Sequence, residues 1–431
     1  MLTLPVIANS FLHTLYNLTD TYWLGRLGTE ALAAINLVTP VQNIVINFGG
    51  GLTTAASVLM AQYVGANRRK DAAALLSQVF TCAIGFALVC AGLISALTPA
   101  LVSWLGADGE VARQAVSYLR VVILDMPFLF TVNLFQALRQ SQGDTLRPML
   151  VNVFGILVNL ALDPLLMVVF RLGAFGAGLA TVLAKAVPAA IAFRLMIKPD
   201  SDIRLRRDMM RPTAPNVRQI LRIGLPTSLG GSAMQFGFLL MSRSVFAYGS
   251  SAMAAYGIGN KINGLISLPS NGIGSATAII VGQNMGAGQP RRAEKGYLMA
   301  MASAVAFLLV GGIILSRPAV SEAMVRVFSN EEDVVAMAAD FLSLMAFWCL
   351  TNGVYNCTTG LFHGTGHTEI TMLSDASRLW VYRFATLYVC AELLHLGVRS
   401  VWLSVVVSNG IAAAVLLVLY LCGLWKKNRV K

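Results

Sequence analysis

Two oxygen-bearing side chains, those of Asn159 and Asp163, lie four positions apart in the apolar segment NLALDPLLM. Residues with this spacing share one face of a helix, so the amide and the carboxylate can hold one ion together. The next residue, Pro164, has no N–H and leaves the Leu160 carbonyl without its helical donor. A further carboxylate, Asp20, lies in the apolar segment LYNLTDTYW. This oxygen-rich set predicts a site for Na⁺, or for a proton shared between carboxylates.

A carboxylate inside hydrocarbon costs several kcal/mol on most scales, so each one needs a partner or a function. One alternative for Asp163 is that it caps a helix end or pairs with a nearby base such as Lys185. Asp20 alone could also have a structural role. Asp125, in VVILDMPF, lies at a helix bend before Pro127, where a structural role is expected. Basic residues embedded in apolar segments are expected to neutralise carboxylates or to snorkel, and they are Lys185, Arg243, Lys261, Arg378 and Arg383.

The motifs of intramembrane and soluble enzymes are missing from the sequence. It contains no DDxxD-like cluster, HExxH, GxSxG or phosphate-binding Gly-Lys loop. The histidines, which are His13, His363, His367 and His395, lie apart without ligand spacing, and the six cysteines show no paired zinc or redox spacing. We therefore expect no enzymatic activity and no cofactor other than a coupling ion.

The amino-acid composition indicates whether water or lipid surrounds the chain. Of 431 residues, 56% are hydrophobic and only 12% are charged, and the mean hydropathy is +0.69. A soluble domain carries about 25% charged residues, so lipid must be the solvent for most of this chain. The net charge of +12 comes from short basic bursts between apolar runs, the pattern of cytoplasmic loops. Nucleic-acid binding is therefore not expected.

Apolar runs long enough to cross a bilayer number about twelve, since a spanning helix needs about 20 residues. They lie near 3–25, 31–64, 74–104, 115–138, 148–170, 174–197, 217–246, 252–285, 296–316, 335–361, 370–393 and 398–424. The fold class predicted is an all-α integral membrane protein with two six-helix bundles. We expect an N-terminal lobe at 1–198, a polar cytoplasmic linker at 199–216, and a C-terminal lobe with a basic tail at 217–431.

Lysine and arginine collect in alternate loops, among them Arg68 to Lys70, Lys198 to Arg222, Arg291 to Lys295 and the tail from Lys426. The side richer in these residues should be cytoplasmic, and it includes the C-terminus. An even number of spans then places the N-terminus on the same side. We expect a multi-pass protein of the bacterial inner membrane with both termini in the cytoplasm.

The two halves of the chain repeat each other. GTEALAA from Gly28 matches GSSAMAA from Gly249, and AQYVGAN matches VGQNMGAG at the same shift. Later, NLFQALRQSQGDTLRPM from Asn133 matches NCTTGLFHGTGHTEITM from Asn356. An even number of helices per half makes these repeats parallel, related by an axis along the membrane normal. Such repeats are typical of transporters in which one bundle rocks against the other.

Several of these segments together resemble the multidrug and toxic compound extrusion (MATE) family over essentially the whole chain. They include YNLTDTYWLGRLG, RQSQGDTLRPM, NLALDP and GAFGAGLATVLA in the first half, and VGQNMGAGQPRRA and GLFHGTGHTE in the second. The resemblance to the DinF-like branch implies a cation site formed by Asp20, Tyr118, Asn133, Asn159, Asp163 and Thr181, with the Ala177 carbonyl as a ligand. If Na⁺ is the ion, its ligands would come from Asp20, Asn159, Asp163 and Thr181. Pro5 matches a proline at which helix one is proposed to bend, and Pro164 marks a second bend.

The NorM-like branch of the family carries acidic coupling residues on helices seven and ten. The corresponding segments here, SLGGSAMQFGFLLM and MAFWCLTNGVYN, contain no carboxylate. At the shift of the later repeat, the partners of Asn159 and Asp163 are Tyr382 and Thr386, which cannot replace them. The resemblance therefore implies coupling in the N-terminal lobe only.

The function that the resemblance implies is antiport: uptake of H⁺ or Na⁺ drives export of lipophilic, mostly cationic organic compounds by alternating access. We expect a monomer whose partners are these compounds and membrane lipid. Two alternatives remain open. A lipid-linked oligosaccharide flippase of the same superfamily would line its cleft with several arginines, and an ion channel would conduct without countertransport.

Overall fold

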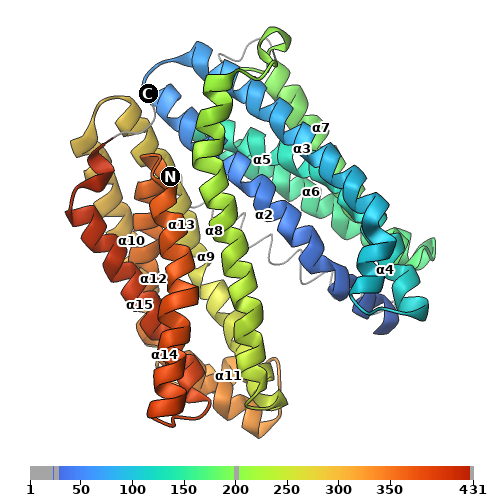
Figure 1. Cartoon of the computed structure of the whole chain (residues 1–431), viewed down its shortest axis with the longest axis vertical. Helices are drawn as coiled ribbons and strands as arrows, with labels where there is room; N and C mark the ends of the chain where they lie inside the picture. The colour runs from blue at the N-terminus through green and yellow to red at the C-terminus, as the bar shows by residue number, and fades with distance from the viewer. Residues whose placement is uncertain (1–22, 24–28, 199–202, 428–431) are drawn as a thin grey trace. The chain divides into compact units, whose positions relative to one another are not determined.

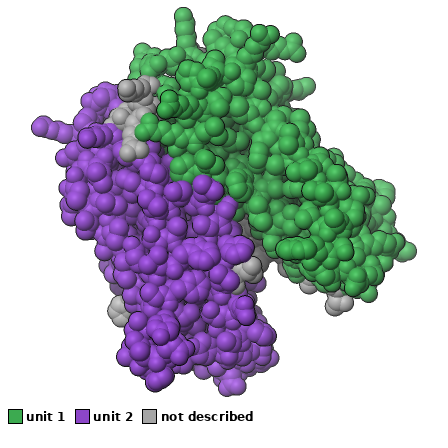
Figure 2. All heavy atoms as spheres, viewed as in Figure 1, with its two compact units in different colours: residues 1–228 green, residues 229–431 purple. Residues whose placement is uncertain are grey.

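The computed structural model describes residues 23, 29–198 and 203–427, and these residues are helical without a β-strand (Figure 1). The chain forms two compact units, residues 1–228 and 229–431 (Figure 2). The first unit runs beyond the predicted linker and into α8, because the start of α8 packs on α2. There the Ser228 hydroxyl donates to the Phe48 carbonyl at 2.9 Å, and Gly51 meets the Gly224 backbone without room for a Cβ atom. The predicted domain boundaries stay a prediction.

The helices of the first unit are α2 (Thr29–Gly65), α3 (Arg69–Trp104), α4 (Gly109–Val122), α5 (Met126–Ser141), α6 (Leu146–Pro164) and α7 (Gly173–Ile197), followed by the start of α8 (Ala214–Phe246). Short 3₁₀ turns occupy Ile123–Asp125 (η1) and Arg207–Met209 (η3), and a π-helical segment, η2, continues α6 over Leu165–Val169. An apolar core joins α2, α4 and α7 through buried residues such as Val38, Leu119 and Ala177.

The second unit contains the rest of α8, then α9 (Ser250–Gly286), α10 (Pro290–Leu315), α11 (Pro318–Arg326), α12 (Glu332–Gly364), α13 (Thr368–Ala376), α14 (Phe384–Tyr388) and α15 (Arg399–Leu421). Two π-helical segments, η4 (Ser377–Arg383) and η5 (Val389–Leu393), flank α14, and a 3₁₀ turn, η6 (Leu424–Lys426), follows α15. Its core includes Tyr256 stacked on Trp402, with ring centroids 6.0 Å apart.

Eight helices among the described residues are long and apolar enough to cross a membrane, and a bent pair in α12 would make a ninth. The span expected at 3–25 lies outside the described residues except for Trp23. Leu88, Val89 and Leu93 on α3 are exposed, as expected of a surface that contacts lipid.

The two units have the same turn geometry at positions that correspond in the sequence repeat. Gly143 and Gly366 both adopt positive φ, 84° and 81°, after helices α5 and α12. Asn67 (φ 56°) and Gly288 (φ 69°) do the same after α2 and α9. Only a residue that tolerates the left-handed region fits such a helix end, so the recurring Gly and Asn keep the turns alike.

The π-helical segments η2 and η5 are also equivalent, because each ends with matching hydrogen bonds. Phe170 N donates to the Leu165 carbonyl at 2.9 Å, and Leu394 N donates to the Val389 carbonyl at 3.1 Å. Tyr388, not a proline, precedes η5. The π-helical geometry after Pro164 therefore belongs to the repeated fold and does not require a proline, and the proposed bending role of Pro164 stays a prediction.

Candidate functional site

The side chains of Asn159 and Asp163, whose i and i+4 spacing predicted a contact, do contact each other on α6. Asn159 Nδ2 donates to Asp163 Oδ1 at 3.2 Å. Asn159 is 2% exposed and Asp163 is 0% exposed. A buried carboxylate at this depth is costly, so the hydrogen bond from Asn159 stabilises its charge in part.

Helices α6 and α7 run antiparallel, and close backbone approaches at two levels determine their register. A Cβ atom on Gly155 would lie 2.7 Å from Pro188 Cγ and 3.1 Å from the Ala184 carbonyl oxygen. Near the other end, a Cβ atom on Gly176 would lie 2.8 Å from the Leu166 carbonyl oxygen. Between these two contacts, each residue further along α6 therefore lies opposite a residue correspondingly earlier on α7.

That register places Asn159 opposite Thr181 and Asp163 opposite Ala177. Thr181 is buried, and its hydroxyl donates to the Ala177 carbonyl at 3.1 Å. The same carbonyl is the one that the family resemblance implied as a ligand. The backbone of Tyr118 on α4 approaches the same turn of α7, because a Cβ atom on Gly178 would lie 3.3 Å from the Tyr118 carbonyl oxygen. The predicted role of the Tyr118 side chain stays a prediction.

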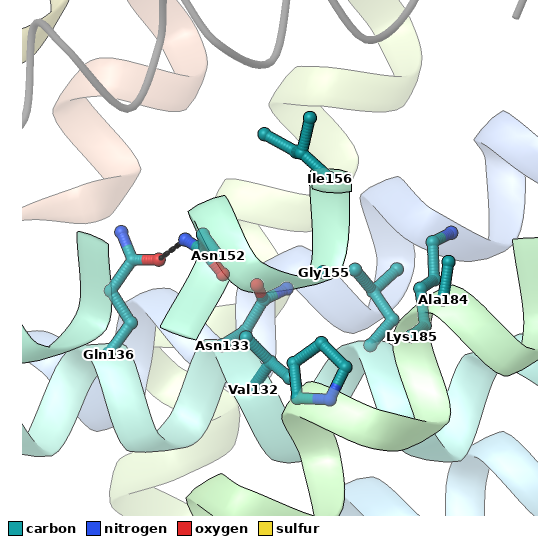
Figure 3. Close-up of a pocket in the computed structure, with 10 residues that line it drawn as sticks. Val132, Asn133, Gln136, Asn152, Gly155, Ile156, Ala184 and Lys185 are labelled. Atoms are coloured by element: carbon teal, nitrogen blue, oxygen red, sulfur yellow. Dashed lines mark hydrogen bonds between the residues drawn. The ribbon is translucent and has the colours of Figure 1, made fainter. Parts of the chain in front are cut away.

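Asn133 lies at a different level, in a cavity of about 160 Å³ within the first unit (Figure 3). The cavity is lined by Leu129, Val132, Asn133, Gln136, Asn152, Gly155, Ile156, Ala184, Lys185 and Pro188. Gly155 and Asp163 are separated by eight residues on α6, which is about 12 Å along the axis. The predicted residues therefore divide into a buried carboxylate group and a neighbouring cavity on the same helices.

Asp20 and Pro5 lie outside the described residues. Among the residues that the structure does describe, no three His, Cys, Asp or Glu side chains gather as a metal site. The Na⁺ ligands proposed from the resemblance thus include three described groups, those of Asn159, Asp163 and Thr181. Neutral and anionic oxygens of this kind suit a hard cation.

Lys185 forms its ion pair with Asp125. Asp125 is 0% exposed and also accepts a hydrogen bond from Gln42 Nε2 at 3.3 Å. The structural role expected for Asp125 is consistent with this pair, and the basic neighbour considered for Asp163 is engaged by another carboxylate. Sequence reading missed the pair because its members lie 60 residues apart on different helices.

In the second unit, the guanidinium of Arg383 occupies the position that the Asn159 amide occupies in the first unit. Asn159 precedes η2 by six residues, and Arg383 precedes η5 by the same number. Arg383 is 3% exposed and donates to Ser408 Oγ at 3.1 Å. The sequence alignment of the repeats gave Tyr382 instead, because the π-helical segment η4 adds one residue that the alignment did not count. A guanidinium at this position repels a cation.

One carboxylate of the second unit was also missed. Tyr355 donates to Asp375 Oδ1 at 2.5 Å, and Arg378 Nη2 lies 3.5 Å from the same oxygen. The Arg378 guanidinium also lies over the Tyr355 ring, 4.5 Å from its centroid. Asp375 is therefore held by a phenol and a guanidinium, which is the arrangement of a structural ion pair.

The chain has two repeated helical units, one of which contains a buried carboxylate, and its sequence matches a known family. A family model for MatE matches residues 5–165 and 226–389, which is most of the chain. The chain belongs to the MatE family. It is therefore a multi-pass membrane transporter and not an enzyme, as the sequence predicted.

Two relatives match the MatE chain along nearly its whole length. It is 25% identical to the probable multidrug resistance protein NorM of Thermotoga maritima, over 100% of this chain and 93% of the relative. It is 24% identical to the multidrug export protein MepA of Staphylococcus aureus, over 97% of this chain and 92% of the relative.

Solved structures of MatE relatives share the fold. An outward-facing multidrug resistance MATE family transporter of the MOP superfamily superposes with a TM-score of 0.89 at 26% identity, covering 99% of this chain and 96% of that one. A MOP superfamily transporter from Pyrococcus furiosus gives a TM-score of 0.91 at 25% identity, covering 99% and 95%. The predicted all-α membrane fold is confirmed.

Proposed function

We propose that this MatE transporter is a cation-coupled antiporter that exports lipophilic, mostly cationic organic compounds. The names of the relatives support this substrate class, since one is a probable multidrug resistance protein and another a multidrug export protein. The observation that carries the coupling is the buried Asp163 carboxylate, which accepts a hydrogen bond from Asn159. The α6–α7 register places it at the level of the α7 turn that contains Ala177 and Thr181.

Transport proceeds by alternating access. In the outward-facing state, Asp163 and Asp20 take up H⁺ or Na⁺, and the first helix is reshaped around Pro5. The change lowers the affinity for the bound organic compound, which leaves to the outside. Each positive charge that enters in excess of the charge exported gains about 2.3 kcal/mol for each 100 mV of membrane potential, and the concentration gradient of the ion supplies the rest of the driving force.

Coupling lies in the first unit, as in the DinF-like branch. This assignment is supported by Arg383, which occupies the position in the second unit equivalent to Asn159 and disfavours a cation there. The carboxylate nearest to it in the chain, Asp375, is held by Tyr355 and Arg378.

We also propose that the transporter is a monomer of the bacterial inner membrane with both termini in the cytoplasm. The distribution of lysine and arginine supports this orientation, since Arg68, Arg69 and Lys70 lie in the turn after α2 and at the start of α3, and the C-terminal tail is basic.

The test is dye export from liposomes that contain the purified transporter, under an imposed pH or Na⁺ gradient. Asp163→Asn and Asp20→Asn should each abolish gradient-driven export, because an amide neither binds a proton at neutral pH nor supplies a full charge to Na⁺. The control is Asp333→Asn, an exposed carboxylate at the start of α12. Export by both site variants at the wild-type rate would refute the coupling assignment.

A further inference from the structure

The first turns of α8 carry two arginines without a counter-charge. Arg218 and Arg222 are exposed and four residues apart, so their guanidinium groups lie on one face of the helix. Neither forms an ion pair or a hydrogen bond with the part of the chain that the structure describes. The sequence has no Asp or Glu between Asp208 and Glu294, so α8 supplies no carboxylate of its own. Like charges at this spacing repel each other, and an anion bound between them would relieve the repulsion.

Other arginines at the same end of the first unit do have partners. Arg68 Nε lies 2.8 Å from Asp71 Oδ2, and Arg206 Nη2 lies 2.7 Å from Asp208 Oδ2. Short-range pairs of this kind neutralise basic residues in the turn after α2 and in the linker. The two arginines of α8 therefore differ from the surrounding basic residues, because a regular helix presents them together and unpaired.

Packing on the other side of α8 determines which face the arginines occupy. Gly224 meets the backbone of Gly51 on α2, and Ile220 is buried. The start of the helix is fixed as well, since Thr213 donates to Gln78 Oε1 from its backbone N at 3.0 Å and from its hydroxyl at 3.1 Å. The outward face of α8 is thus held in place before any ligand binds, which lowers the entropy cost of binding.

The same outward face also carries exposed apolar side chains. Leu221 is 50% exposed and Leu225 is 48% exposed. An open pocket of about 720 Å³ runs along this face, and the residues that line it are Ala214, Val217, Arg218, Leu221, Arg222 and Leu225. The pocket therefore combines two guanidinium groups with an apolar wall, which suits a ligand that is anionic at one end and hydrocarbon at the other.

The length of α8 indicates where this pocket lies in a bilayer. The helix is continuous over 33 residues, which is about 50 Å, whereas the hydrocarbon core is about 30 Å thick (Figure 1). The first turns of α8 should therefore lie at the level of the lipid headgroups, with Leu225 nearer to the hydrocarbon than Arg218. A phospholipid presents its groups in the same order, with the phosphate outside and the acyl chains inside.

We propose that this face of α8 binds an anionic phospholipid. Arg218 and Arg222 bind the headgroup phosphate, because guanidinium groups pair with phosphate oxygens in bidentate geometry. Leu221 and Leu225 pack against an acyl chain. Phosphatidylglycerol is preferred over phosphatidylcholine, since the choline cation would be repelled by the two guanidinium groups. The site goes beyond the proposed antiport, and only its assignment to the cytoplasmic leaflet rests on the proposed orientation.

Titration of the purified full-length transporter in detergent tests the proposal. Phosphatidylglycerol and phosphatidylcholine with identical acyl chains are added, and bound lipid is counted by native mass spectrometry. Arg218→Gln combined with Arg222→Gln should weaken phosphatidylglycerol binding about thirtyfold, because each basic side chain near anionic lipid contributes about a factor of five. Phosphatidylcholine binding should not change. The matched control, Arg291→Gln with Arg292→Gln, removes the same charge from the exposed start of α10 and should leave both affinities unaltered.

Two further measurements separate a lipid from a free phosphate ester. Glycerol phosphate, which has the phosphate but no acyl chain, should not displace phosphatidylglycerol at equal concentration. Leu221→Ser combined with Leu225→Ser should weaken binding of both lipids by a similar factor and keep the preference for phosphatidylglycerol. These side chains are exposed, so the variants should unfold at the wild-type temperature when no lipid is added.

Three results would overturn the proposal. One is a wild type that binds both lipids equally, and another is the same loss of phosphatidylglycerol binding in both arginine double variants, which would indicate general attraction to a basic surface. The third is displacement by glycerol phosphate, which would identify a site for a soluble phosphate ester. The titration involves neither an ion gradient nor export, so its failure would leave the proposed antiport standing, and failure of the antiport would leave the lipid site standing.

Discussion

Gly155 on α6 lies directly against Pro188 on α7, so close that a Cβ atom on Gly155 would stand 2.7 Å from Pro188 Cγ. The contact sets the register of two antiparallel helices that carry both the carboxylate group and the cavity. One turn further along α6 is Asn159, and two turns further is Asp163; the facing positions on α7 are Thr181 and Ala177. We therefore expect the proposed coupling between ion and substrate to depend on how tightly these helices pack.

Gly155→Ala should therefore destabilise the transporter by about 1–3 kcal/mol, because neither the proline ring nor the Ala184 carbonyl can move aside easily. Thermal unfolding in detergent measures the effect. The matched control is Gly85→Ala on α3, where no described atom lies within 4 Å of the added Cβ. That control should be neutral or slightly stabilising, since alanine is the better helix former. Equal unfolding temperatures for the two variants would contradict the close packing.

Asn159→Ala should weaken binding of Na⁺ about tenfold if Na⁺ is the coupling ion, because the cation loses the Asn159 amide oxygen as a ligand. If H⁺ is the coupling ion, proton uptake should instead become easier, because the Asp163 carboxylate loses the N–H that donates to it at 3.2 Å. The measurement is the ion concentration that gives half-maximal dye export from liposomes. Asn152→Ala, two turns earlier on the same face, is the control and should leave that concentration unchanged. An unaltered ion dependence in Asn159→Ala would show that the amide serves packing alone.

Thr181→Val replaces a buried hydroxyl by a methyl group of nearly the same shape. If the Thr181 oxygen is a cation ligand, export should require an ion concentration about tenfold higher, whereas Thr181→Ser should behave as the wild type. The comparison separates loss of an oxygen from loss of volume. Should serine and valine weaken export to the same extent, the methyl group and not the hydroxyl would be the functional part.

Asp375→Asn should destabilise the second unit by about 2 kcal/mol, because Tyr355 and Arg378 lose a charged partner. The dependence of export on ion concentration should not change, since this carboxylate is assigned to structure. Thermal unfolding and liposome export measure the two effects. A shift in ion dependence without a loss of stability would place a coupling group in the second unit and contradict the assignment to the first.

Several properties follow from local sequence. The scarcity of charge requires lipid as solvent, and the recurring Gly and Asn at Gly143, Gly366, Asn67 and Gly288 predict the repeated turns, because each needs a residue that tolerates positive φ. The spacing of Asn159 and Asp163 predicts their contact, since helical geometry alone brings residues four apart together. Such features depend on near neighbours in the chain.

Other properties were decided by tertiary structure. Lys185 forms its ion pair with Asp125 and not with Asp163, although the sequence allowed either carboxylate as its partner. The packing of the helices around Lys185 decides between them. Arg383 takes the position equivalent to Asn159 because η4 inserts a residue into the helix, which an alignment of letters does not detect. The cavity beside Asn133 exists only where three helices meet. Helical periodicity determines which residues share a face, but the packing of one helix on another determines what that face meets.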